Sequence, residues 1–340
     1  MDIEAAQPPS HRDVSEQRAG LTRRLGYTSS PVYVFTSDHF VLPLPDDHRF
    51  PMAKYAGLRE VVERWLPDHF LAEAPPVTDD QIALAHSAAY VDAVLHGTLH
   101  RRAVRRIGFP WSPELVARER RSVGGTLAGA RAALLRGRGV NLAGGTHHAH
   151  PDQGGGFCLF NDAAVTLRTL QAEGRIERGM VIDCDVHQGD GTAVVFQDDP
   201  SVFTLSVHGA SNYPFRKPPS DLDVPLPKGT GDQGYLDALT AALERAFRFF
   251  SPDLVIYQSG VDPWKGDRLG TLALTADGLL RRDQAVFATC DAAEVPVVVT
   301  MGGGYAPSVE DIVALHAQTV FEALREAWPT QGWRMPLQGR

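Results

Sequence analysis

The sequence has 340 residues, of which 43% are apolar and 22% are charged, enough apolar material for a large core in a soluble globular protein. Its formal net charge of -8 at pH 7 argues against a general nucleic-acid binder, because such proteins need a basic surface to displace counterions from phosphate. The three cysteines are too few and too scattered for a disulfide framework. No signal peptide and no apolar run of membrane-spanning length is recognisable. We therefore expect a cytoplasmic protein without direct nucleic-acid contacts or a membrane span.

Three parts are expected along the chain. Residues 1–29 contain prolines and many charged or small polar groups, which predicts a flexible N-terminal arm. One folded catalytic domain is expected over residues 30–328, because no internal repeat or linker interrupts this range. Residues 329–340 are expected to form an irregular tail.

Short apolar runs alternate with longer segments of helical period across the expected domain. This pattern is typical of βα units around a mainly parallel sheet. The predicted strands cover residues 140–143, 180–186, 202–207, 254–258 and 295–301. The predicted helices cover residues 114–135, 161–173, 235–250 and 278–293. The prediction is an α/β fold with a mainly parallel central sheet between helices.

Polar side chains follow four of the predicted strands, near the point where each strand ends. Open α/β sheets bind ligands at the carboxyl ends of their strands, so we expect these four connections to converge on one pocket. In chain order the residues are His147 and His148, then Asp185 and His187, then Asp262, and finally Tyr305.

Two of these connections predict a metal site. Alternation along the strand 180–186 would place Asp183, Asp185 and His187 on one face, where buried carboxylates need a cation or protonation. Asp262 adds another oxygen. One histidine and two carboxylates leave open positions for water and substrate on a zinc-type ion, so we predict Asp185, His187 and Asp262 as its ligands. The alternatives are hydrogen bonding at a strand end and, for Asp262, capping of a helix.

The vicinal histidines His147 and His148 predict proton transfer. Two preceding glycines allow an irregular loop that turns both rings toward one pocket. One imidazole could accept a proton from water while the other stays protonated, with Asp183 and Asp190 fixing their tautomers. The alternative is a chance cluster of surface histidines, and we expect the nearby His150 to be a solvated loop residue.

Tyr305 ends the run Met-Gly-Gly-Gly-Tyr, in which the glycines let the backbone approach a ligand. Its phenol could donate a hydrogen bond to a carbonyl that becomes an oxyanion during hydrolysis. A half-buried aromatic side chain without a catalytic role is the alternative. A second glycine run, residues 154–156, lacks the lysine and hydroxyl of a phosphate loop and is expected to form a flat channel wall.

Together these motifs resemble the zinc-dependent histone deacetylases, over about residues 31–320. The likeness rests on Gly145-Thr-His-His-Ala-His-Pro-Asp-Gln-Gly-Gly-Gly-Phe-Cys-Leu-Phe-Asn-Asp162 and on Ile182-Asp-Cys-Asp-Val-His-Gln-Gly-Asp-Gly191. The resemblance implies a single three-layer α/β/α domain of the arginase/deacetylase kind. It also implies a deacylase in which metal-bound water attacks the acyl group. His148 would then be the general base, His147 its electrostatic partner and Tyr305 the group that polarises the carbonyl. Asp183 and Asp190 would be the carboxylates behind the histidines.

The resemblance further implies a subclass and bound ions. The run Ser259-Gly-Val-Asp-Pro-Trp-Lys-Gly-Asp-Arg-Leu-Gly270 is most similar to class IV deacetylases and their bacterial relatives. The catalytic ion would be Zn²⁺, with Fe²⁺ as the alternative. A structural K⁺ would be held by Asp183, Asp185, His187, Ser206 and Val207.

Substrate contacts are also implied by the resemblance. They would come from Gly156, Phe157, Tyr213 and Phe215, although the loop 209–215 departs from the class I pattern. The substrate would be an acylated lysine peptide or protein, or another acylated amine such as an acetylpolyamine. Class IV likeness favours acyl chains longer than acetyl, and each buried methylene could contribute about 0.8 kcal/mol.

Two rival functions are a manganese ureohydrolase of the arginase kind and a non-catalytic reader of acyl-lysine. Ureohydrolases use an Asp-x-His-x-Asp arrangement, whereas Gly189 stands at the third place here. A reader would be expected to lack a catalytic residue, whereas all those assigned above are present. The oligomeric state is left open.

Overall fold

The computed structural model of the chain describes residues 33–39, 42–45, 48–325 and 327. The arm expected over residues 1–29 and the tail expected over 329–340 lie outside these ranges, so both remain predictions.

The described residues form an eight-stranded sheet in the order β2-β1-β3-β8-β7-β4-β5-β6, in which neighbouring strands run parallel. Parallel neighbours require crossover connections, which the helices between the strands provide. The strands are β1 Val34–Thr36, β2 Leu71–Glu73, β3 Arg138–Asn141, β4 Gly179–Asp183, β5 Val202–Gly209, β6 Leu222–Leu226, β7 Leu254–Gln258 and β8 Val297–Thr300.

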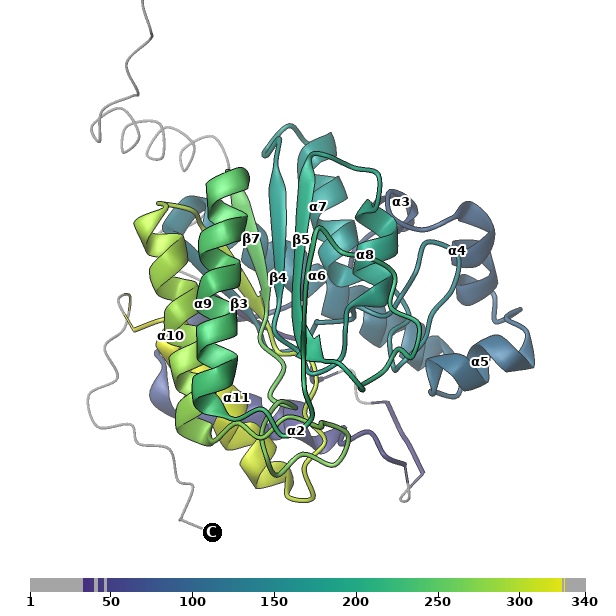
Figure 1. Cartoon of the computed structure of the whole chain (residues 1–340). Helices are drawn as coiled ribbons and strands as arrows, with labels where there is room; N and C mark the ends of the chain where they lie inside the picture. The colour runs from purple at the N-terminus through teal and green to yellow at the C-terminus, as the bar shows by residue number, and fades with distance from the viewer. Residues whose placement is uncertain (1–32, 40–41, 46–47, 326, 328–340) are drawn as a thin grey trace, which may run out of the picture.

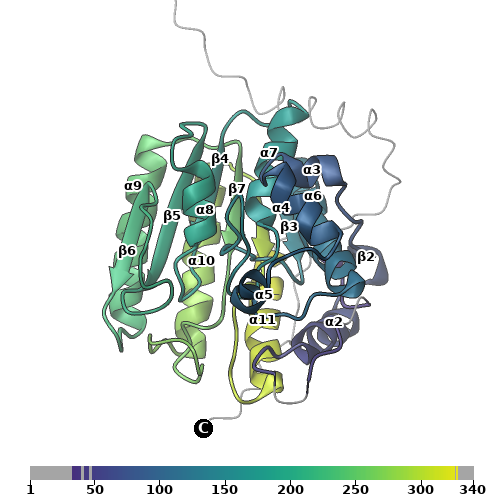
Figure 2. The same cartoon turned by 90° about the vertical axis from the view of Figure 1, so that its right-hand side faces the viewer.

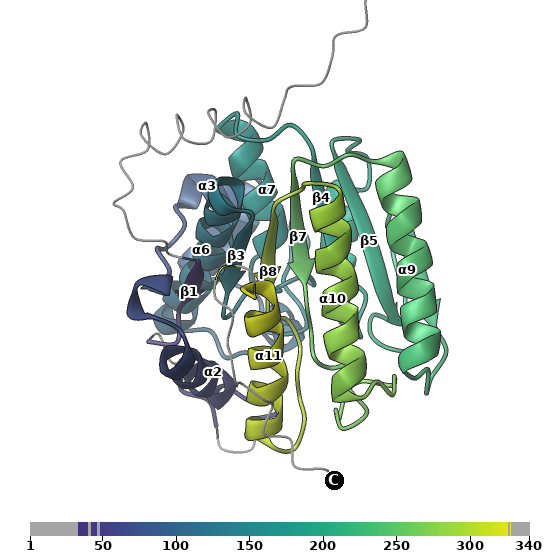
Figure 3. The same cartoon turned by 90° about the vertical axis from the view of Figure 1, so that its left-hand side faces the viewer.

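Helices cover both faces of the sheet. Helices α2, α9, α10 and α11 lie on one face and α6 and α7 on the other (Figures 1 and 3), while Figure 2 shows α4, α5 and α8 in front of the sheet on the second face. The helices are α2 Ala53–Trp65, α3 Asp79–Ala83, α4 Ala88–Leu95, α5 Arg101–Ile107, α6 Pro113–Arg136, α7 Asp162–Ala172, α8 Asp190–Phe196, α9 Asp232–Phe249, α10 Ala276–Ala292 and α11 Val309–Ala323. None of the described helices is long and apolar enough to cross a membrane.

Each face of the sheet has its own apolar core. In β4, Met180 and Ile182 belong to the cluster under α9, α10 and α11, while Val181 belongs to the cluster under α6 and α7. This alternation follows from the two-residue period of a strand, and a strand buried on both faces must be apolar on both. The predicted three-layer α/β/α fold is therefore confirmed.

One predicted boundary at the site is wrong. The strand expected over residues 180–186 ends at Asp183, so strand alternation does not place Asp185 and His187. The Asp183 carboxylate accepts a hydrogen bond from the backbone N–H of Asp185 (3.1 Å), a local turn that competes with the ladder. The loop after β4, not the strand, positions the two predicted ligands.

Candidate active site

The carboxyl ends of four neighbouring central strands carry the predicted site residues. Strands β3, β8, β7 and β4 are adjacent in the sheet, so the loops that follow them lie side by side. These loops carry His147 and His148 after β3, Tyr305 after β8, Asp262 after β7, and Asp185 and His187 after β4. All of these residues except the buried Asp262 line one small cavity. The expected convergence of four connections is therefore present.

The three predicted metal ligands form a compact cluster. One ligand atom from each of Asp185, His187 and Asp262 lies within 4.8 Å of the others. His187 Nδ1 is 3.0 Å from Asp185 Oδ1 and 3.2 Å from Asp262 Oδ2. Asp262 is fully buried, and its Oδ2 makes no contact of hydrogen-bond geometry, so its approach to His187 is only an ion-pair contact. Such an oxygen is costly to bury unless something positive meets it, and two carboxylates with one imidazole form a donor set that suits a catalytic zinc-type ion.

The two cluster carboxylates oppose each other electrostatically. Burial, and then the charge of Asp185, raises the pKa of Asp262 to about 7. Burial alone would also raise the pKa of Asp185, but the charges on His147 and His187 outweigh it and hold that pKa well below its ordinary value. A divalent cation would relieve this crowding of negative charge.

The vicinal histidines each lie against a carboxylate. His147 Nδ1 is 2.7 Å from Asp183 Oδ2, and His148 Nδ1 is 2.5 Å from Asp190 Oδ1. The Nε2 atoms of the two rings are 3.1 Å apart and face the cavity side of the cluster. Both rings are thus held through Nδ1, and their Nε2 atoms meet each other at hydrogen-bond distance, where a proton can be exchanged.

The environment separates the pKa values of the two imidazoles. Burial lowers both, but the charges of Asp183 and Asp185 outweigh burial at His147 and raise its pKa to about 9. At His148 the charge on His147 adds to burial, and the pKa falls to about 4. Near neutral pH one ring is therefore cationic and its neighbour neutral, as a base with an electrostatic partner requires.

Tyr305 is held beside this cluster by its backbone. Its N–H donates to Asp267 Oδ2 at 2.6 Å, so the aspartate of the Gly266–Gly270 run fixes the position of the tyrosine. The ring of Tyr305 lies edge-on to His187 with centroids 6.4 Å apart. Burial, and then the charges of Asp185 and Asp262, raises the pKa of the phenol well above its ordinary value. The phenol therefore remains a hydrogen-bond donor.

Gly303 closes the cluster from the side of β8. Its N–H donates to Asp185 Oδ2 at 2.8 Å, and a Cβ at this position would lie 1.9 Å from Asp262 Oδ2. A glycine at position 303 thus allows close approach of the backbone to both carboxylates of the cluster.

Comparison with known proteins agrees with this geometry. Residues 48–321 match the histone deacetylase domain. The chain belongs to the histone deacetylase family. It is 46% identical over 290 residues to an uncharacterized protein of Picosynechococcus sp., covering 82% of this chain and 93% of the relative. It is 31% identical over 296 residues to histone deacetylase 2 of Arabidopsis thaliana, covering 84% and 76%.

Bacterial relatives and solved structures extend this assignment. The deacetylase chain is 27% identical over 337 residues to acetoin utilization protein AcuC of Staphylococcus aureus, covering 92% of this chain and 86% of the relative. A solved histone deacetylase homologue in complex with SAHA matches with a TM-score of 0.74 and 25% identity, covering 87% and 84%. A homologue from Aquifex aeolicus, at 24% identity and a TM-score of 0.74, covers 86% and 83% and shows the same fold. The chain is therefore a deacetylase-type hydrolase with the arginase/deacetylase-like fold.

The four predicted substrate contacts of this deacetylase differ in position. Phe157 lines the cavity, and a Cβ on Gly156 would lie 2.5 Å from His148 Cδ2. Tyr213 lies edge-on to His148 with ring centroids 4.9 Å apart. Phe215 is 90% exposed and does not line the cavity. The first three therefore adjoin the reacting groups, whereas Phe215 projects into solvent.

The residues that the resemblance assigns to K⁺ lie on neighbouring elements. Asp183 on β4 and Ser206 on β5 are register partners, and Val207 follows on β5. Their proximity is compatible with a shared ion, and the potassium site remains a prediction.

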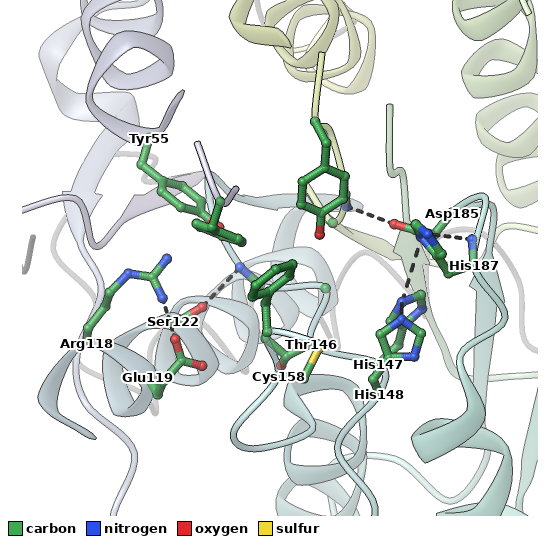
Figure 4. Close-up of a pocket in the computed structure, with 17 residues that line it drawn as sticks. Tyr55, Arg118, Glu119, Ser122, Thr146, His147, His148, Cys158, Asp185 and His187 are labelled. Atoms are coloured by element: carbon green, nitrogen blue, oxygen red, sulfur yellow. Dashed lines mark hydrogen bonds and ion pairs between the residues drawn. The ribbon is translucent and has the colours of Figure 1, made fainter. Parts of the chain in front are cut away.

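The cavity of this deacetylase has a charged inner side that the sequence did not indicate. Figure 4 shows Tyr55, Arg118, Glu119 and Ser122 opposite His147, His148, Asp185 and His187. Arg118 and Glu119 form a buried ion pair on α6, and Glu119 Oε2 has no hydrogen-bond partner. The sequence signal that could have revealed this side of the cavity is the pair of charged residues Arg118 and Glu119 on an otherwise buried helix face.

Two further polar residues were missed. His150, expected to be solvated, instead places Nε2 2.8 Å from Asp190 Oδ2, so that expectation is wrong. Asp190 therefore lies between two histidines, and its second oxygen attracts the ring of His150 inward. Lys54 is fully buried, donates from Nζ to Gly302 O at 3.1 Å and lies 5.5 Å from the Tyr305 ring centroid. Burial lowers the pKa of Lys54 to about 8. No local pattern marks Lys54 as a neighbour of a loop nearly 250 residues away.

Proposed function

We propose that this family member is a metal-dependent, class IV-like deacylase that acts in the cytoplasm on acylated lysine side chains or a related acylated amine. One observation carries the proposal. The buried cluster of Asp185, His187 and Asp262 lies beside two Asp–His pairs, and the histidines of those pairs line the same cavity as Asp185 and His187. Neither a ureohydrolase nor a non-catalytic reader would need this combination of metal ligands, paired histidines and a phenol.

The residues present divide the work of amide hydrolysis. Asp185, His187 and Asp262 would hold Zn²⁺, or Fe²⁺ as the alternative, which when bound supplies Lewis acidity toward water and the acyl carbonyl. His148, neutral near pH 7, accepts the proton of the attacking water and returns it to the leaving amine. Asp190 orients the ring of His148 for both transfers.

Two groups stabilise the negative charge that develops in the reaction. Tyr305 donates a hydrogen bond from its phenol, which its raised pKa keeps protonated. His147, cationic because Asp183 and Asp185 raise its pKa, stabilises negative charge beside the base. The acyl bond to nitrogen breaks, and the products are a carboxylate and a free amine.

The cavity favours a short acyl group. Its volume is about 30 Å³, room for roughly two water molecules at ~10–15 Å³ each. The inner side carries the buried pair Arg118 and Glu119, and an alkyl chain could not supply the hydrogen bond that Glu119 Oε2 lacks. These features support acetyl as the preferred group, whereas class IV likeness predicts a longer one, so chain length is the property to measure.

Hydrolysis assays with metal analysis test the proposal. One lysine peptide carrying acetyl, butyryl, octanoyl or myristoyl groups, together with acylated polyamines, would be assayed below micelle-forming concentrations, and bound metal would be measured on the same preparation. We expect kcat/KM to fall from acetyl onward and activity to require one bound metal ion. A rise in kcat/KM toward octanoyl or myristoyl would support the longer-chain prediction. Absence of hydrolysis across the panel from metal-loaded enzyme would overturn the proposed function.

A further inference from the structure

Arg282 is a fully buried arginine on α10 that does not line the catalytic cavity. A buried guanidinium is costly unless its donors meet acceptors, so its partners indicate why the fold keeps it there. Its neighbour Arg281 is exposed on the same helix. The two arginines are therefore chemically identical and adjacent in the sequence, but only Arg282 is buried.

The guanidinium of Arg282 donates to the backbone of both loops that carry metal carboxylates. Nη1 donates to Gly260 O at 2.5 Å and to Cys184 O at 3.4 Å, and Nη2 donates to Ser259 O at 3.1 Å. Cys184 directly precedes Asp185, and Ser259 and Gly260 lie three and two residues before Asp262. One rigid cation thus spans the ends of β4 and β7.

The guanidinium is itself fixed from behind. Its Nε donates to Asp283 Oδ1 at 2.9 Å. Asp283 also accepts hydrogen bonds of 2.6 Å from the Tyr257 hydroxyl on β7 and from Thr319 Oγ1 on α11. Charge-assisted hydrogen bonds of this kind are stronger than neutral ones, so the arginine is held in one orientation.

The loops after β4 and β7 are packed closely against each other. A Cβ on Gly260 would lie 2.3 Å from Asp185 Oδ2, which shows how closely the loop after β7 approaches the first carboxylate. Asp262 Oδ1 accepts a hydrogen bond from Val186 N at 2.9 Å. A shift of either loop would therefore change the separation of the carboxylate oxygens that face His187.

We propose that Arg282 is a positioning residue that fixes the spacing of the loops carrying Asp185 and Asp262, and so sets the affinity and coordination geometry of the metal centre. This inference rests on the proposed metal site. A planar fork with several fixed donors can join carbonyls of two loops, whereas lysine presents one compact ammonium and glutamine carries no charge. Groups behind metal ligands typically change metal affinity about 10- to 100-fold when removed.

The test uses full-length protein loaded with Zn²⁺ or Co²⁺. Metal affinity would be measured by competition with a chelator, and coordination geometry by the visible absorption of the Co²⁺ form. We expect Arg282→Gln to weaken metal binding about 10- to 100-fold and to alter the Co²⁺ spectrum, with Arg282→Lys intermediate. Arg281→Gln is the matched control on the exposed side of α10 and should leave both readouts unchanged.

A second control separates positioning from general stability. Trp111→Phe removes the hydrogen bond from its Nε1 to Val94 O (2.7 Å), which lies outside the network of Arg282 and Asp283, so it should lower the melting temperature without changing metal affinity. If Arg282→Gln does not fold, Arg282→Lys decides. Wild-type affinity and spectrum in a folded Arg282 variant would overturn the inference while leaving the metal site intact. Failure of the wild-type protein to bind either metal would instead overturn the proposed function, and this inference with it.

Discussion

At the scale of single residues, burial and neighbouring charges together set the charge state of the paired histidines. Asp183 and Asp185 outweigh burial and hold His147 cationic, whereas burial and the charge on His147 keep His148 neutral. A base and an electrostatic partner therefore arise from two identical side chains because their carboxylates and neighbours differ. Single substitutions can test such individual contributions. A change at Tyr305 removes a proposed hydrogen-bond donor, and a change at Asp262 removes a proposed metal ligand.

Replacement of Tyr305 by phenylalanine should remove only the hydrogen bond to the carbonyl oxygen. Its backbone contact with Asp267 would remain, so the fold and metal content should be retained. We expect kcat to fall by about two to three orders of magnitude, as for other single oxyanion donors. Steady-state kinetics on metal-loaded protein checks this, and an unchanged kcat would exclude the phenol from the reaction.

Replacement of Asp262 by alanine should abolish tight metal retention and hydrolysis together. Two remaining ligands cannot hold the ion against water, and Val186 N would also lose its acceptor. Elemental analysis after gel filtration measures the retained metal. One equivalent of metal with unaltered activity would show that the coordination sphere is assigned incorrectly.

At the scale of elements, the site depends on strand ends and on the loops that leave them. In the loop after β8, Gly303 N–H donates a hydrogen bond to Asp185 and Tyr305 lies beside His187. One short run therefore holds a proposed metal ligand and carries the proposed oxyanion donor. Lys54 from α2 fixes the same run through Gly302 O. Helix α2 and the loop after β8 are far apart in the sequence, and Lys54 joins them beside the candidate site.

Replacement of Gly303 by alanine tests this loop. The new Cβ would lie 1.9 Å from Asp262 Oδ2, so the loop or the carboxylate must shift. We expect metal affinity to fall by roughly tenfold or more, with the helical circular dichroism spectrum preserved. Gly231→Ala is the matched control, because a Cβ there meets its nearest atom, Ala273 O, at 3.8 Å. Equal metal affinity in both variants would refute the close-packing argument.

Elements with a clear periodic or apolar signal were predictable, whereas the two shortest strands and helix α11 were not. Strand β7 matches its predicted range, and α6 differs from its prediction by one residue at each end. Strands β1 and β2 have three residues each, too few for a pattern. Helix α11 is buried at nearly every position from Ile312 to Phe321, so it lacks the polar face that identifies an amphipathic helix.

At the scale of the whole molecule, the sheet order determines which loops meet. The sequence indicated that polar residues follow strand ends, but the adjacency of β3, β8, β7 and β4 was not readable from local patterns. Asp185, His187 and the paired histidines could be proposed as site residues because they cluster in two short motifs, and Asp262 because it follows a predicted strand. Lys54 and Arg282 could not, because they act on carbonyls distant in sequence and carry no motif.

The buried side chain of His86, which joins distant segments, predicts how the stability of the fold depends on pH. His86 is buried, its Nδ1 lies 3.0 Å from His150 O, and its Nε2 accepts a hydrogen bond from Asn161 N at 2.9 Å. It therefore links the start of α4 to the loops after β3. Burial lowers the pKa of His86 from 6.5 to about 4. A protonated ring would lose its acceptor at Nε2, so the fold requires the neutral form.

The sign of the effect follows from this lowered pKa. Above about pH 6.5 the imidazole is neutral in the folded and unfolded chains, and its full contribution to stability is present. As the pH falls from 6.5 toward 4, the unfolded chain takes up a proton that the folded chain does not, so stability is lost, by about 3 kcal/mol for such a shift. We therefore expect the free energy of unfolding of wild type to exceed that of His86→Gln by a margin that shrinks over this range. Urea unfolding at a series of pH values measures the margin, with His96→Gln as an exposed-histidine control. A margin for His86→Gln that stays constant from pH 7 to pH 4 would show that the buried imidazole is not the group that couples folding to protons.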